Sequence, residues 1–106
     1  MRGGPKMSSF VMAATPLSDA EIEQSLAKIP GWERQGEVIS RTFSFSSYLS
    51  GIDFVNRVAE LAETDNHHPD IQVGWRKVTL KLSTHSAHGL TQKDFDLAQK
   101  VDVLVD

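Results

Sequence analysis

The chain has 106 residues, of which 40% are hydrophobic and 24% charged, and this composition is typical of one globular domain rather than of a disordered chain. Its formal net charge of −3 gives no electrostatic reason to expect a nucleic acid or an anionic membrane as partner. The absence of cysteine excludes disulfides, thiolate nucleophiles and cysteine-based zinc sites.

Residues 1–16 mix glycine, proline, serine and alanine and hold no continuous apolar segment of signal-peptide length. We expect a disordered tail there, with a weak transit peptide as the alternative, and a single domain over residues 17–106. No apolar run reaches the roughly 18–20 residues that cross a bilayer. Because a chain without cysteine fits a reducing compartment, we expect a cytoplasmic location, with the nucleus as the alternative.

The first helix is predicted to follow Ser18, because Ser18 and Glu21 have the spacing of a capping box. Apolar residues recur at helical spacing as far as Ile29, and Pro30 ends the helix. A hairpin is expected next, with arms at 32–35 and 38–45.

A second helix is predicted from about residue 47 to residue 63, since its apolar residues form one stripe. It cannot continue past Pro69, so a loop should leave the end of this helix. Residues 71–73 and 75–84 then resemble two short strands, or one bent strand that is broken at Gly74. In the second of them Val78, Leu80 and Leu82 alternate with polar residues, which predicts one buried face.

The last helix is predicted to begin after Thr91, with Asp94 completing a capping box. Its apolar stripe consists of Phe95, Ala98, Val101 and either Leu104 or Val105. The order of elements predicts an α+β fold in two layers, a four-stranded antiparallel sheet with helices packed on one face.

All four histidines lie between positions 67 and 88, and His67 and His68 are adjacent. Imidazole exchanges protons near neutral pH, so the cluster indicates a proton-transfer site. Because Pro69 holds His68 in an extended conformation, the two adjacent rings should point to opposite sides. Glu63, in the last helical turn, is positioned to orient an imidazole or to hold a ligand N–H. His85 ends the following strand-like run.

Two other interpretations compete with proton transfer. A metal site would need several of His67, His68, His85 and Glu63 to converge on one ion at about 2.0–2.2 Å. Adjacent histidines that face opposite ways rarely bind the same ion, so no metal is expected. In the second interpretation the histidines have a structural role only and form hydrogen bonds to the backbone in a turn. Separately, His88 is expected to be an exposed loop residue.

The longer pattern extends from Glu63 through His67-His68-Pro69 and the strand 77–85 to Gly89-Leu90-Thr91 and Asp94. This pattern, with sixteen residues from Pro69 to His85, resembles the pterin-4a-carbinolamine dehydratase family, also known as the dimerisation cofactor of a hepatocyte transcription factor. The resemblance covers about residues 17–104. The chain departs from the family at Asn66, where relatives often carry aspartate, and at Ile71, where they carry an aromatic residue.

The resemblance implies dehydration of 4a-hydroxytetrahydropterin to quinonoid dihydropterin, in tetrahydrobiopterin recycling, with no metal or redox cofactor. It also implies a homodimer, sometimes a tetramer, of the same two-layer α+β fold. The implied catalytic residues are His67, His68 and His85. The implied substrate-binding residues are Glu63, His67, His68, Pro69, Thr84, His85, Ser86 and Ala87.

A protein-binding role is the competing hypothesis, because the family includes a transcription-factor dimerisation cofactor and assembly factors. Such roles use the helix surface rather than the histidines and do not require catalysis. Neither hypothesis implies direct contact with a nucleic acid or a membrane. We expect the enzyme function, because all three histidines of the family are present in this chain.

Overall fold

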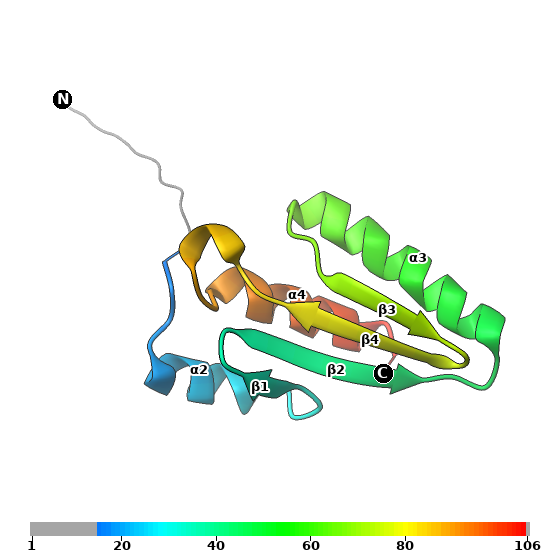
Figure 1. Ribbon diagram of the computed structural model, residues 1–106, viewed down its shortest axis with the longest axis horizontal. Helices are drawn as coiled ribbons and strands as arrows, with labels where there is room; N and C mark the ends of the chain where they lie inside the picture. The colour runs from blue at the N-terminus through cyan, green and yellow to red at the C-terminus, as the bar shows by residue number, and fades with distance from the viewer. Residues whose placement is uncertain (1–14, 106) are drawn as a thin grey trace.

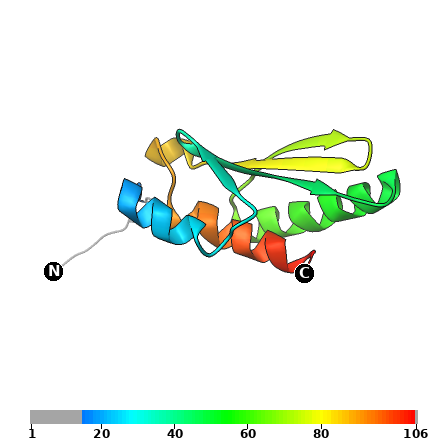
Figure 2. The same ribbon diagram turned by 90° about the horizontal axis from the view of Figure 1, so that it is seen from below.

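Four antiparallel strands and three helices form two layers in residues 15–105, the part of the chain that the computed structural model describes (Figure 1). The elements in chain order are α2 Asp19–Leu26, β1 Glu33–Gln35, β2 Val38–Ser44, α3 Tyr48–Asp65, β3 Asp70–Gly74, β4 Lys77–Leu82, the short 3₁₀ helix η1 His85–Ala87 and α4 Gln92–Val103. The strand order is β1-β2-β4-β3. All three helices lie against the same face of the sheet (Figure 2), so the predicted α+β fold is confirmed.

The predicted capping box at the start of α2 is present. The Glu21 N–H donates to the Ser18 hydroxyl at 3.2 Å, and the Ser18 N–H donates to the Glu21 carboxylate at 2.8 Å. The helix ends at Leu26, earlier than the predicted end at Ile29. The next residues turn more tightly, with the Ile29 N–H bonded to the Leu26 carbonyl, because Pro30 disfavours a helical conformation in the residue before it. Ile29 is still buried.

The segment 70–84 forms two strands rather than one bent strand. β3 and β4 pair antiparallel, from Asp70 opposite Lys81 to Gly74 opposite Lys77. The chain reverses between them at Trp75 and Arg76, and Arg76 takes a positive φ of 62°. The predicted alternation in β4 is confirmed, because its inward side chains are the fully buried Val78, Leu80 and Leu82.

The sheet and the helices bury one continuous core between them. β4 lies in the middle of the sheet, and its inward side chains meet apolar residues from α3 and α4. The buried side chains of the two longer helices are Phe54, Val58, Ala62, Phe95, Leu97, Ala98 and Val101. This packing fixes the end of α3 beside the start of α4, which is where the candidate site lies.

The helix α3 extends two residues beyond the predicted end at Glu63 and stops at Asp65. Ser47 caps its first turn through its hydroxyl, which accepts from the Ser50 N–H at 3.1 Å. Among residues 15–105, no helix is long and apolar enough to span a membrane. Residues 1–14 and 106 lie outside the described residues, so the division into a tail (1–16) and a domain (17–106) stays a prediction.

Candidate active site

The turn that ends α3 determines where His67 lies. Asn66 adopts a left-handed conformation, with φ 50° and ψ 43°, which asparagine tolerates better than most residues. The His67 N–H then bonds to the Ala62 carbonyl at 3.0 Å, and the Asn66 N–H bonds to that of Glu63 at 3.3 Å. These two bonds are those of a Schellman motif, so the departure from the family at Asn66 fits a helix C-terminus.

The His67 ring bonds to a buried carboxylate. Its Nε2 lies 2.6 Å from Asp94 Oδ1; the His67 side chain is 10% exposed and that of Asp94 is fully buried. The other oxygen of Asp94 accepts from the Thr84 hydroxyl at 2.7 Å and from the Thr91 N–H at 3.0 Å. The two threonine hydroxyls are themselves 2.8 Å apart. Asp94 therefore joins the end of α3, the end of β4 and the start of α4.

The neighbouring ring, His68, has a different partner. Its Nε2 lies 2.5 Å from Glu63 Oε2, and the two side chains are 53% and 78% exposed. The prediction that Pro69 turns the two rings to different sides is consistent with these separate partners. Glu63 therefore contacts an imidazole, that of His68, and its predicted alternative role of holding a ligand N–H stays a prediction.

His85 begins η1 and is exposed to solvent. Its Nε2 lies 3.4 Å from the Ser83 hydroxyl. Among the described residues, no hydrogen bond joins His85 to His67 or His68. His85 is linked to His67 indirectly, through the residue before it in the chain. The hydroxyl of that residue, Thr84, donates to the same Asp94 carboxylate that holds His67.

The remaining predicted site residues fall in the same two segments. Pro69 follows His68 and is partly buried, Ser86 is exposed, and Ala87 is partly buried in η1. His88 is exposed, as predicted, with a φ of 57° at the end of η1.

Trp32 is buried in the core and its Nε1 donates to Asp102 at 2.9 Å, so it anchors the hairpin to α4.

A small cavity of about 210 Å³ lies beside His67. Its other walls are side chains of α3 and α4, namely Asp65, Lys93, Asp96 and Lys100. The two lysines and two aspartates around this cavity balance in charge, and Lys100 is paired with Asp65 at 2.9 Å. Neither His68 nor His85 contributes to its walls. In residues 15–105 no group of three or more histidine, aspartate and glutamate side chains is arranged to hold a metal ion.

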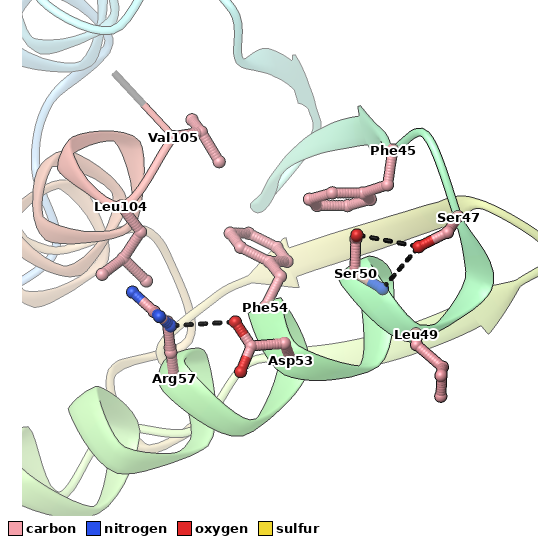
Figure 3. Close-up of a pocket in the computed structure, with 9 residues that line it drawn as sticks. All are labelled: Phe45, Ser47, Leu49, Ser50, Asp53, Phe54, Arg57, Leu104 and Val105. Atoms are coloured by element: carbon pink, nitrogen blue, oxygen red, sulfur yellow. Dashed lines mark hydrogen bonds and ion pairs between the residues drawn. The ribbon is translucent and has the colours of Figure 1, made fainter.

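A larger hollow of about 560 Å³ lies at the other end of α3 (Figure 3). Figure 3 shows the rings of Phe45 and Phe54 between Leu104 and Val105 on one side and the exposed Leu49 on the other. Its charged wall residues include Asp53 and Arg57, which pair with each other. This mostly apolar groove carries no histidine, so it offers a contact surface rather than proton-transfer chemistry.

The sequence predicted Asp94 as a capping residue, and the capping box is present. It did not predict that the second oxygen of the same carboxylate would hold His67. A carboxylate in the first turn of an amphipathic helix, on the apolar side next to Phe95, is the signal that could have indicated a buried partner.

Comparison with known proteins gives one consistent result. The model of the family described as pterin 4 alpha carbinolamine dehydratase matches residues 15–104. Proteins from Roseiflexus sp. (strain RS-1) and Roseiflexus castenholzii are 59% and 56% identical, over 87% of this chain and 99% of each relative. Both are provisionally named pterin-4-alpha-carbinolamine dehydratase.

Two solved structures have a similar fold. The crystal structure of a transcriptional coactivator/pterin dehydratase from Brucella melitensis has a TM-score of 0.84 at 29% identity, covering 87% of this chain and 100% of that one. A pterin dehydratase-like protein identified as a RuBisCO assembly factor in the alpha-carboxysome has a TM-score of 0.62 at 28% identity, covering 70% of this chain and 88% of that one.

Proposed function

This chain belongs to the pterin 4 alpha carbinolamine dehydratase family, and we propose that it removes water from 4a-hydroxytetrahydropterin by histidine general acid–base catalysis. Relatives that are 45–59% identical over most of the chain carry the same enzyme name, so the chain is a dehydratase of this class. The product would be quinonoid dihydropterin, recycled to tetrahydrobiopterin after aromatic amino-acid hydroxylation. The location that we propose is the cytoplasm.

The observation that carries the proposal is the pairing of His67 with Asp94. A carboxylate on one ring nitrogen orients an imidazole and stabilises the imidazolium that forms when the other nitrogen takes a proton. Dehydration needs such a group, because the C4a–O bond breaks while N5 loses its proton and a C4a=N5 double bond forms. We propose that His67 and His85 share the acid and base roles and that His68 positions the pterin ring.

The substrate would lie between the two histidine-bearing segments. Thr84, Ser86 and Ala87 would line one side of the pterin, with Pro69 on the other. Glu63 would support His68 or contact a ring N–H. The proposed site needs no metal ion, since proton transfer alone accounts for the reaction.

The test is to follow quinonoid dihydropterin by its ultraviolet absorbance when enzymatically generated 4a-carbinolamine meets the purified protein. His67→Ala and His85→Ala should each lower kcat by roughly 10²–10⁴, the usual effect of losing one acid–base group. His88→Ala is the matched control, an exposed histidine from the same segment that should leave kcat unchanged. Full activity in both the His67 and the His85 variants would reject the assignment.

A protein-binding role remains the second candidate, with the groove of Figure 3 as its surface. The groove is mostly apolar, it includes the exposed Leu49, and it lies at the end of α3 away from the histidines. A wild-type protein that does not accelerate dehydration over the spontaneous rate would favour this role. A coactivator function of this kind would place the protein in the nucleus.

We also propose that the chain forms a homodimer, or a tetramer built from dimers. β3 is an edge strand of the sheet, and its Val73 and the following Trp75 are large exposed apolar residues. An edge with exposed apolar side chains favours pairing with another strand. Light scattering of the purified protein tests this, and Val73→Lys should shift the population towards monomer.

A further inference from the structure

A chain of hydrogen bonds with one fixed direction ends at His67. An ionised carboxylate only accepts, so the Thr84 hydroxyl must donate to Asp94 Oδ2, 2.7 Å away. The single hydroxyl proton of Thr84 is then used, so the Thr91 hydroxyl must be the donor in the 2.8 Å contact between the two threonines. The Thr91 oxygen in turn accepts the Lys93 N–H at 3.3 Å.

This direction determines which nitrogen of His67 carries a proton. Two donors, the Thr84 hydroxyl and the Thr91 N–H, converge on Oδ2 of the buried Asp94 and hold the carboxylate in one orientation. Oδ1 is then an acceptor for the ring, so Nε2 of His67 holds a hydrogen in the neutral and in the charged imidazole alike. Nδ1 is left as the atom whose protonation changes.

We propose that the hydroxyls of Thr84 and Thr91 are positioning groups for catalysis, which keep the proton of His67 on Nε2 and make Nδ1 the base of the dehydration. The inference rests on the proposed function. In the step, the N5–H bond of the substrate breaks and its proton passes to Nδ1, while the nitrogen electron pair forms the C4a=N5 bond. The C4a–O bond breaks, and the hydroxyl leaves as water with a proton from His85. Proton exchange with solvent restores both rings, and no oxidant or reductant is consumed.

A second threonine pair, which lies within the sheet, provides a natural comparison. Thr42 and Thr79 also lie with their hydroxyls 2.8 Å apart, but on the open face of the sheet. Within residues 15–105 no hydrogen bond links this pair to an ionisable side chain, whereas Thr84 and Thr91 are buried and lead to Asp94. The two pairs share geometry and differ in what they are bonded to, so Thr79 serves as the control position.

The experiment combines long-range ¹H–¹⁵N spectra of the histidine rings with steady-state kinetics on the full chain. The wild-type spectrum should show the neutral His67 ring protonated on Nε2. In Thr91→Val the Thr84 hydroxyl loses the donor that orients it and can turn away from Asp94. The carboxylate is then no longer held against Nε2 of His67, so the other tautomer should appear. The value of kcat should fall about tenfold, the rate equivalent of one lost hydrogen bond, while KM stays within about twofold.

Two control variants separate this role from a general effect on folding. Thr91→Ser keeps the hydroxyl and should restore both the spectrum and kcat, and Thr79→Val should change neither. An active wild-type protein with the proton on Nδ1, or a Thr91→Val variant with unchanged kcat, overturns the inference and leaves the proposed function standing. An inactive wild-type protein overturns the proposed function and the catalytic part of the inference together. If Thr91→Val does not fold, the wild-type spectrum still decides where the proton lies.

Discussion

Two imidazole–carboxylate pairs lie next to each other in this chain, and their surroundings differ. The His67–Asp94 and His68–Glu63 contacts have nearly the same length, 2.6 Å and 2.5 Å. The first pair is almost completely buried and its carboxylate accepts two further hydrogen bonds. The second pair is exposed at the surface.

The comparison shows that contact distance alone does not measure how firmly a ring is held. An exposed ion pair contributes about 0–1 kcal/mol, because water and salt screen it. A buried carboxylate with several donors fixes its partner more strictly, because any other arrangement leaves a buried polar group without a bond. We therefore infer that His67 is the rigid group of the site and that His68 adapts its position to the substrate.

The largest expected effect comes from Asp94→Asn, which removes the charge of the buried pair and keeps its shape. The amide can donate to Nε2 of His67, so the ring would move its proton to Nδ1 and lose its base. We expect kcat to fall by about 10³–10⁴, as in a catalytic triad whose carboxylate becomes an amide. Stopped-flow absorbance of quinonoid dihydropterin measures the rate, and long-range ¹H–¹⁵N spectra report the tautomer.

Asp102→Asn is the matched control for this variant. Asp102 lies in the same helix and also accepts two hydrogen bonds, from Trp32 at 2.9 Å and Arg41 at 2.7 Å. Its substitution should lower the thermal unfolding temperature without a change in the tautomer of His67. Equal loss of kcat in the two variants would mean that Asp94 acts only through the stability of α4.

The difference between the two pairs also shows what the sequence could predict. The expectation that the two rings point to different sides comes from Pro69 alone, because the proline restricts the residue before it. The Glu63–His68 contact follows from a helix end and its next few residues, which is local information. The same is true of the two capping boxes, at Ser18 and Thr91, and of the alternation along β4.

The partner of His67 could not be predicted in this way. Asp94 is 27 residues from His67 in sequence, and their contact depends on how α4 packs beside the end of α3. Such packing is decided by the whole core rather than by a local pattern. The same reason explains why the sequence left open whether segment 70–84 forms two strands, since pairing is a contact between strands.

A smaller effect is expected from His68→Ala. If His68 adapts to the substrate and holds the pterin by one hydrogen bond, its loss should raise KM about tenfold. The value of kcat should change only a few-fold, because the base and its carboxylate remain in place. Steady-state kinetics over a range of substrate concentrations separates the two parameters. A fall in kcat as large as that of His67→Ala would show that His68 transfers a proton itself.

The smallest effect is expected from Glu63→Gln, which weakens only the exposed pair. Because such pairs contribute about 0–1 kcal/mol, kcat/KM should fall by no more than about fivefold. At an ionic strength near 1 M the Debye length is about 3 Å, so screening should remove most of the difference between variant and wild type. The Asp94→Asn defect should persist in the same salt, since its charge is buried. A Glu63→Gln defect that is large and insensitive to salt would mean that the substrate buries this pair too, and both rings would then be held equally firmly in the complex.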